Sequence, residues 1–255
     1  MTVRMAEMTW CDYARRVDEG QPVLLPVGSI EQHGFHMPLS VDVIIPLALA
    51  SEVARRVGAI VAEPFAYGYK SQPRSGGGQS FRGTTSLDGA TLTALMRDLL
   101  REFARHGVRR VALIDGHFEN AMFLIEGVDL ALRDLAAQGV HDMKVARIDY
   151  WEFITLEAQA ATFDEGFPGW ALEHASIMET SMMLHLRPDL VDLSQVVEDG
   201  PAKLALWDAY PLPDGTVPSS GVLSTTRGAT AAKGRMLFDV YTAGVERAVR
   251  ESFAL

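Results

Sequence analysis

Carboxylates and histidines alternate in two short stretches of the chain. Together with one nearby aspartate, these stretches supply Glu31, His33, Asp42, His117 and Glu119. In an extended backbone, the acid and the histidine of a Glu-x-His or His-x-Glu pair point to the same side. Carboxylates and imidazoles without thiolates suit zinc, manganese, iron or similar divalent ions. Because five such side chains exceed what one catalytic zinc takes from a protein, the pattern favours a two-metal site with one bridging carboxylate.

Other common catalytic patterns are missing from the sequence. It contains neither the His-Glu-x-x-His motif of zinc proteases nor a Gly-x-Ser-x-Gly nucleophile elbow. Cys11 is the only cysteine, which excludes a zinc site built from cysteines. A single histidine is more often a hydrogen-bonded structural residue than a metal ligand, and we interpret His106, His141 and His185 in this simpler way.

Two further segments have sequences suited to holding a small ligand. Ser75 is followed by three glycines but not by Gly-Lys-Ser/Thr, which favours a turn or a close backbone approach to a ligand over a phosphate cradle. Trp151 and Trp170 flank a segment rich in glycine and proline, and they are either core residues or an aromatic lid over a flat ligand. Glu173 and His174 are expected to open the next helix, where His174 could move protons if it lies near the metal site.

Apolar runs predict the strands of a parallel sheet, and helical periodicity predicts the helices between them. Strands are expected at residues 23–28, 108–114 and 144–150, with a weaker one at 59–65 because Pro64 ends it. Helices are expected at residues 45–57, 87–106, 120–138, 171–186 and 229–253, and a surface connection at 199–218. This alternation predicts an α/β layered domain with right-handed crossovers. Because ligands gather at the carboxyl ends of such strands, both acid–histidine clusters should meet at one edge of the sheet.

The composition describes one acidic globular domain, residues 1–255. The chain has 255 residues, of which 48% are hydrophobic and 22% charged, and its net charge is -10. This negative charge argues against nucleic acid and against an anionic membrane surface as partners. No apolar run approaches the roughly 20 residues of a membrane helix, and the first residues lack the apolar region of a signal peptide. With a single cysteine, these features predict a cytoplasmic protein.

Several motifs along the chain are specific enough to suggest a family. Residues 26–34 read PVGSIEQHG and residues 115–120 read DGHFEN. Both resemble signatures of the creatininase family, the creatinine amidohydrolases, which usually have Asn-Gly-His at the second motif. Residues 69–72, 75–78, 83–92 and 179–181 also resemble the creatinine-hydrolysing branch. The likeness runs from about residue 7 to the C-terminus and therefore concerns nearly the whole chain.

The resemblance implies a fold and a metal site. The fold would be a three-layer α/β/α sandwich with a mostly parallel central sheet, and each subunit would hold two divalent ions. By analogy, Glu31, Asp42 and His117 would hold one ion. His33, Asp42 and Glu119 would hold the other ion, with Asp42 bridging. The family uses zinc and manganese, and its members assemble as homohexamers.

The resemblance also implies a small-molecule substrate and a reaction. The residues that would line the substrate pocket are Ser75, Phe118, Trp151, Trp170 and Glu173. Glu119 would accept or relay a proton from water, and His174 would protonate the departing nitrogen. The expected function is hydrolysis of a cyclic amide by a metal-bridged hydroxide, with creatinine and water giving creatine.

Three positions depart from the pattern of the family. Phe118 stands where creatinine-hydrolysing enzymes usually have tyrosine, and Ala171 stands where an aspartate is expected. These losses could redirect specificity, because a site built around hydrogen bonds discriminates by orders of magnitude. Asp115 replaces an asparagine and is expected to tune the surroundings of His117. Two alternatives therefore stay open: a family hydrolase for a different small cyclic or linear amide, and a non-catalytic metal-binding scaffold.

Overall fold

The fold is that of a computed structural model, which describes residues 2–255. A four-stranded parallel sheet, in the order β2-β1-β3-β4, forms its centre. The strands are β1 (Val23–Val27), β2 (Ile60–Val61), β3 (Arg110–Asp115) and β4 (Lys144–Asp149). Val27 pairs with Asp115, which pairs with Asp149 on its other side, so three strands end at the same level. Every residue of β1 is buried, as expected for a strand that is covered on both faces.

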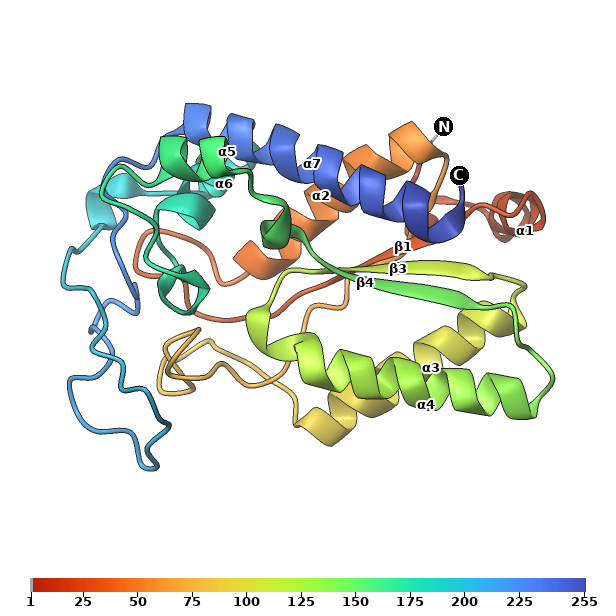
Figure 1. Ribbon diagram of the computed structural model, residues 1–255, viewed down its shortest axis with the longest axis horizontal. Coiled ribbons are helices and arrows are strands. Elements are labelled where there is room, and N and C mark those ends of the chain that lie inside the picture. Colours follow the sequence, from red (N-terminus) through yellow and green to blue (C-terminus); the bar gives the residue numbers. More distant parts are fainter. Residues whose placement is uncertain (1) are drawn as a thin grey trace.

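Helices cover both faces of the sheet and complete three layers (Figure 1). Above the sheet in that view lie α2 (Val41–Val57), α5 (Leu156–Thr162), α6 (Ile177–Leu186) and α7 (Ala231–Phe253). Below it lie α3 (Gly89–Arg105) and α4 (Ala121–Ala137), and α1 (Trp10–Asp18) lies beyond one end of the sheet. Each face of the sheet has its own hydrophobic core. The predicted α/β/α sandwich is therefore confirmed.

The amphipathic pattern of the helices explains these layers. In α3, Leu92, Met96 and Leu100 are fully buried and recur every four residues, so one face of the helix packs on the core. On the outer side, the Arg97 guanidinium donates to both carboxylate oxygens of Asp134 in α4, at 2.6 and 2.9 Å. Short 3-10 turns complete the elements at Met5–Glu7, Phe118–Asn120 (η2), Tyr150–Phe153 (η3), Trp170–Leu172 (η4), Pro188–Leu190 and Leu193–Gln195.

The structure corrects the predicted bounds of three elements. Helix α2 begins at Val41 rather than at residue 45, which places Asp42 in its first turn. Helix α6 begins at Ile177 rather than at residue 171, because Ala175 has a φ of 55°, a left-handed conformation that interrupts a helix. The prediction that Glu173 and His174 open this helix is therefore wrong. The weak strand at 59–65 is reduced to the two residues of β2.

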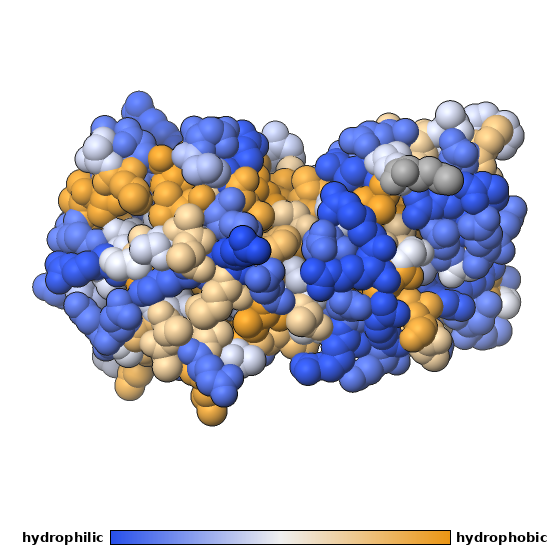
Figure 2. Space-filling model, turned by 90° about the horizontal axis from the view of Figure 1, so that it is seen from above, coloured by the Kyte–Doolittle hydropathy of each residue, from blue (hydrophilic) through white to orange (hydrophobic). Residues whose placement is uncertain are grey.

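The loops that follow the strands gather at one end of the sheet, on the left of Figure 1. The segment 199–218 contains no helix or strand and extends below that end, in agreement with the predicted surface connection. Within residues 2–255, no helix is long and apolar enough to cross a membrane. Seen from above, hydrophobic side chains gather over the end that carries α5 and the start of α7, whereas the opposite end is mostly hydrophilic (Figure 2).

Candidate metal centre

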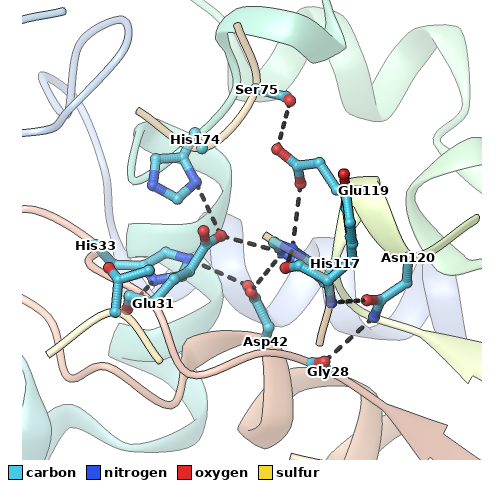
Figure 3. Close-up of polar contacts among 12 residues, drawn as sticks. Gly28, Glu31, His33, Asp42, Ser75, His117, Glu119, Asn120 and His174 are labelled. Atoms are coloured by element: carbon cyan, nitrogen blue, oxygen red, sulfur yellow. Dashed lines mark hydrogen bonds and ion pairs between the residues drawn. The ribbon is translucent and has the colours of Figure 1, made fainter. Parts of the chain in front are cut away.

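The two acid–histidine clusters meet at the carboxyl end of the sheet (Figure 3). Glu31 and His33 lie in the loop after β1, and Asp42 lies in the first turn of α2. His117 follows β3 in an extended conformation, but Glu119 lies in the 3-10 turn η2. The prediction that His117 and Glu119 lie together in an extended backbone is therefore wrong. The two side chains nevertheless approach each other, because the 3-10 turn bends the chain back over the site.

One group of potential ligands combines both strand ends with α2. His117 Nδ1 lies 3.2 Å from Glu31 Oε1 and 3.2 Å from Asp42 Oδ2. All three side chains are buried, and their ligating atoms lie within 4.8 Å of one another. Two carboxylates and one imidazole at such distances form a donor set that a divalent cation can join.

A second group shares Asp42 and brings in a residue from α6. His33 Nε2 lies 3.1 Å from Asp42 Oδ1 and 3.7 Å from Glu179 Oε2. Asp42 thus turns one carboxylate oxygen to each histidine. Glu179 was not expected to be a ligand, although it belongs to the motif at residues 179–181 and is the only acid in the mostly apolar segment IMETSMMLHL, a signal that could have identified it.

Glu119 lies on the far side of His117 from Asp42. Its Oε2 is 3.4 Å from His117 Nε2. Its Oε1 accepts hydrogen bonds from the hydroxyl of Ser75 at 2.5 Å and from the backbone N–H of Gln72 at 2.9 Å. Among the residues that the structure describes, no group of three potential ligands includes Glu119. In this structure, Glu179 lies beside His33 and Asp42, and the ligand role expected of Glu119 stays a prediction.

In this centre, the histidines and the neighbouring carboxylates stabilise each other's charged forms. Burial alone would lower the pKa of both histidines, but the carboxylates around them prevail. Asp42 and Glu179 hold the pKa of His33 well above its ordinary value, and Glu31 and Glu119 do the same for His117. Burial would raise the pKa of Asp42, but His33 and His117 hold it below its usual range. Burial raises the pKa of Glu31. The negative charge of this cluster attracts cations.

Three ligating atoms have no hydrogen-bond partner among the described residues. They are Glu31 Oε2, His33 Nε2 and Asp42 Oδ2. His33 Nε2 and Asp42 Oδ2 each have a neighbour close enough for an ion pair but form no hydrogen bond with it. A buried polar atom without a partner costs free energy, on the order of 1–3 kcal/mol each. Converging atoms of this kind are typical of a metal site, where a cation satisfies them together.

A hydrogen-bond network holds the ring and the backbone of His117 in position. Its Nε2 lies 3.0 Å from the carbonyl oxygen of Tyr69, which places the ring proton on Nε2 and leaves Nδ1 for a metal. The Asp115 carboxylate accepts from the backbone N–H of His117 and from the side-chain amide of Asn120, both at 3.2 Å. Asn120 also donates to the Gly28 carbonyl and accepts from the Tyr69 N–H. The loops after β1 and β3 are thereby tied together.

Two glycines allow α2 to reach this network. A Cβ on Gly28 would lie 2.3 Å from the carbonyl oxygen of Asp42, and a Cβ on Gly116 would lie 2.4 Å from the same atom. Real Cβ atoms do not approach backbone atoms this closely. Glycine at the end of both strands therefore permits the first turn of α2 to bring Asp42 between the two histidines.

The expected pocket residues surround this centre. The pocket is lined by Glu31, Asp42, Ser75, Gly116, His117, Phe118, Glu119, Tyr150, Trp151, Trp170, Glu173, His174, Met178 and Glu179. Phe118 stacks on Trp151 with a centroid distance of 6.2 Å, which forms an aromatic wall. Ala171 does not line this pocket but a neighbouring groove, which shares Ser75 and Phe118 with it.

The loop before α6 contributes Glu173 and His174. Nδ1 of His174 lies 3.6 Å from Glu31 Oε1, beside the first group of ligands. Glu173 accepts the backbone N–H of Met178 at 2.9 Å, and Glu179 accepts that of Ala175 at 2.6 Å. Burial, reinforced by Glu179, raises the pKa of Glu173 well above its ordinary value. Both carboxylates therefore cap the start of α6 while they border the pocket.

Comparison with known proteins agrees with this geometry. The family model for creatininase, described as creatinine amidohydrolase, matches residues 6–249. The chain belongs to the creatininase family. A creatinine amidohydrolase of Pseudomonas putida is 48% identical over 254 residues, which cover 99% of this chain and 98% of that protein.

Solved creatininase structures share the whole fold. Among them are a manganese form, a zinc–zinc form of a variant and a variant complexed with creatine. Each is 46–47% identical to this chain, covers 99% of both chains and superimposes with a TM-score of 0.97. The creatininase fold is therefore shown for this chain over nearly its full length.

Proposed function

We propose that this creatininase hydrolyses creatinine to creatine with two divalent metal ions in each subunit. The observation that carries the proposal is the position of Asp42, whose two carboxylate oxygens face two separate groups of buried ligands at the base of one pocket. The identity of 48% with a creatinine amidohydrolase over almost the entire chain supports creatinine as the substrate. It favours creatinine over a different cyclic or linear amide and favours an enzyme over a metal-binding scaffold.

The residues present fit a pair of zinc or manganese ions. Glu31, Asp42 and His117 would hold one ion. His33 and Asp42 would hold the other with Glu179, which replaces Glu119 in the expected set because its carboxylate is the one near His33. The three atoms without hydrogen-bond partners belong to these ligands and support the fit. Bound together, the ions would lower the pKa of a water molecule and polarise a carbonyl oxygen of the substrate.

In this proposal, Glu119 accepts the proton that water loses. Ser75 and the Gln72 N–H hold its Oε1, and its Oε2 stays beside His117. This arrangement holds the carboxylate at the edge of the candidate metal centre. As the oxygen of water bonds to the amide carbon, the carbon–nitrogen bond of the ring breaks. One proton of water would go to Glu119, and the other would stay on the new carboxyl group until that group ionises. The departing nitrogen would take its proton from protonated His174, and the proton held by Glu119 would then restore His174.

In this proposal, His174 delivers a proton to the departing nitrogen. It borders the pocket opposite Glu119, with Glu31 between them (Figure 3). Phe118, Trp151 and Trp170 offer flat surfaces on which a planar ring can lie. Glu173, whose raised pKa favours its neutral form, can donate a hydrogen bond to the ligand. These side chains would orient the ring so that its carbonyl group faces the carboxylates and histidines that would hold the metals and its nitrogen faces His174.

The setting that we propose is a single catalytic domain in a cytoplasmic homohexamer, with no nucleic acid or membrane as partner. Hydrophobic side chains on the outer surface support self-association. They gather near α5, where Leu156 is 84% exposed (Figure 2). Light scattering of the purified protein tests this assembly, because a monomer at micromolar concentration would contradict it.

A substrate panel tests the proposed reaction. The metal-reconstituted protein would be assayed for ring opening of creatinine and of other small lactams and cyclic ureides, with linear amides as further controls. We expect creatine as the product and creatinine as the preferred substrate. Turnover of another ring without any turnover of creatinine would contradict creatinine as the substrate. The loss of polar contacts at Phe118 and Ala171 would then be the first cause to examine.

A further inference from the structure

A cavity lies at the end of the sheet opposite the candidate metal centre, where β3 and β4 begin. Its volume is about 360 Å³, within the range of pockets that hold small molecules. The ends of α1 and α7 border it, so it lies toward the right of Figure 1. Val17 and Phe253 give the cavity an apolar wall, and Arg109, Arg110 and Lys144 give it positive charge.

The charges of the side chains around this cavity do not balance. Among the described residues that line it, Asp142 is the only acid, and its carboxylate lies 3.0 Å from the Arg109 guanidinium. Arg109 also donates to two backbone carbonyl oxygens near the end of α3, at 3.0 and 2.9 Å, so the fold itself explains this cation. Within residues 2–255, the side chains of Arg110 and Lys144 have neither an acidic partner nor a hydrogen bond. Two positive charges therefore remain unpaired in the cavity.

The sheet holds these two unpaired charges close together. Arg110 is in register with Lys144 on the neighbouring parallel strand, so both side chains point to the same face of the sheet. Neighbouring strands lie about 4.8 Å apart, and like charges directly opposite each other destabilise a sheet. The chain has a net charge of -10, so a shortage of acidic residues does not explain why these cations lack partners. An anion in the cavity would contact both side chains and remove the repulsion.

The chemistry of the cavity favours a phosphate group over a carboxylate. A phosphate monoester carries close to two negative charges at neutral pH and has three oxygens that accept hydrogen bonds. It therefore matches two unpaired cations, whereas a carboxylate carries one charge. The planar guanidinium of Arg110 can donate to two phosphate oxygens, and the amino group of Lys144 supplies the second positive charge. Val17 and Phe253 offer apolar surface to the organic part of such an ester.

We propose that this cavity binds a small phosphate ester, with its phosphate group between Arg110 and Lys144 and its apolar part against Phe253. The cavity lies where β3 and β4 begin, and the candidate metal centre lies at their carboxyl ends. The ester is therefore a second ligand and not the substrate of the proposed reaction. Its binding involves neither the metals nor hydrolysis, so the test below stands apart from the success or failure of the proposed function.

Calorimetric titration of the zinc-loaded protein with phenyl phosphate tests the site. We expect saturable binding to wild type, and binding about 10–100-fold weaker after Arg110→Gln or Lys144→Gln, because each variant loses charge-assisted hydrogen bonds to the phosphate. Arg227→Gln is the matched control and should bind as wild type does, because it removes one exposed positive charge before the start of α7, at the other end of that helix from Phe253. Equal affinity in all four proteins would contradict the proposal, since the phosphate would then lie elsewhere, the zinc ions included.

Thermal unfolding at low ionic strength tests the same two side chains by a second route. Without any phosphate, Lys144→Gln should raise the melting temperature, because it removes the repulsion from Arg110. Phenyl phosphate should raise the melting temperature of wild type by more than that of this variant, and benzyl alcohol, which has the ring without the charge, should change neither. A melting temperature lowered by Lys144→Gln would overturn the proposal. Loss of the native oligomeric state in Arg110→Gln, seen by light scattering, would also overturn it, because the occupant of the cavity would then be a second copy of the chain.

Discussion

Replacing Asp115 by asparagine should remove a large part of the pH dependence of stability. The Asp115 carboxyl is fully buried at the end of β3. Burial, reinforced by the charge of Asp149, raises its pKa from 3.8 to about 7, although Arg147 and the His117 N–H partly oppose this rise. At a pH between these two values, Asp115 therefore keeps its proton in the folded protein but has lost it in the unfolded chain. Asparagine keeps the shape and the acceptor oxygen for His117 and Asn120 but carries no titrating group.

The magnitude follows from the two pKa values. A group whose pKa is higher in the folded state stabilises the fold fully below its unfolded pKa, and that contribution is lost as the pH rises through the folded value. For Asp115 the window lies between 3.8 and about 7. Each unit of difference is equivalent to about 1.4 kcal/mol, so wild type should lose about 3 kcal/mol relative to Asp115→Asn between about pH 5 and pH 8.

Urea unfolding of both metal-free proteins across this pH range provides the assay. The difference between their free energies of unfolding cancels all other titrating groups, which the two proteins share. We expect wild type to lose stability relative to the variant as the pH rises, with the curves becoming parallel above about pH 8. A difference that stays constant from pH 5 to pH 8 would refute the reasoning, because it would mean that Asp115 has the same pKa in both states.

Three further substitutions separate ligands from catalytic groups. His117→Ala should lower metal content and abolish nearly all creatine formation, and full metal content with retained activity would show that His117 is not a ligand. Glu179→Gln should weaken binding of one ion, so that metal analysis finds about one ion per chain after dialysis; two tightly held ions would return that position to Glu119. Glu119→Gln should keep both ions and lower kcat by about 10²–10⁴-fold, as expected for loss of a general base, and a loss of metal instead would make it a ligand.

Much of the fold could be predicted from local patterns. The strands β1, β3 and β4 are apolar on both faces, so their runs stand out in the sequence and their ends place the acid–histidine clusters at one edge. The start of α6 could not be predicted, because the interruption is a backbone conformation that the apolar pattern does not encode. Ala175 adopts a left-handed conformation there, and the buried carboxylate of Glu179 accepts its N–H. Apolar periodicity carries no signal of such a cap.

The candidate site shows the same division. Glu31, His33, Asp42 and His117 were identified from spacing and strand ends, which depend on the sequence alone. Glu179 lies on a helix far along the chain, and only the packing of α6 against α2 brings it to His33.

Titration of the metal-stripped protein with manganese or zinc, with creatine formation from creatinine as the readout, tests the central claim most directly. We predict no turnover without metal and a rise in activity that ends at two equivalents of metal per chain, because Asp42 belongs to two of the three overlapping groups of potential ligands. Full activity in the stripped protein, or saturation at one equivalent, would contradict the two-metal site. Two bound ions per chain without any creatine would contradict the reaction that we propose.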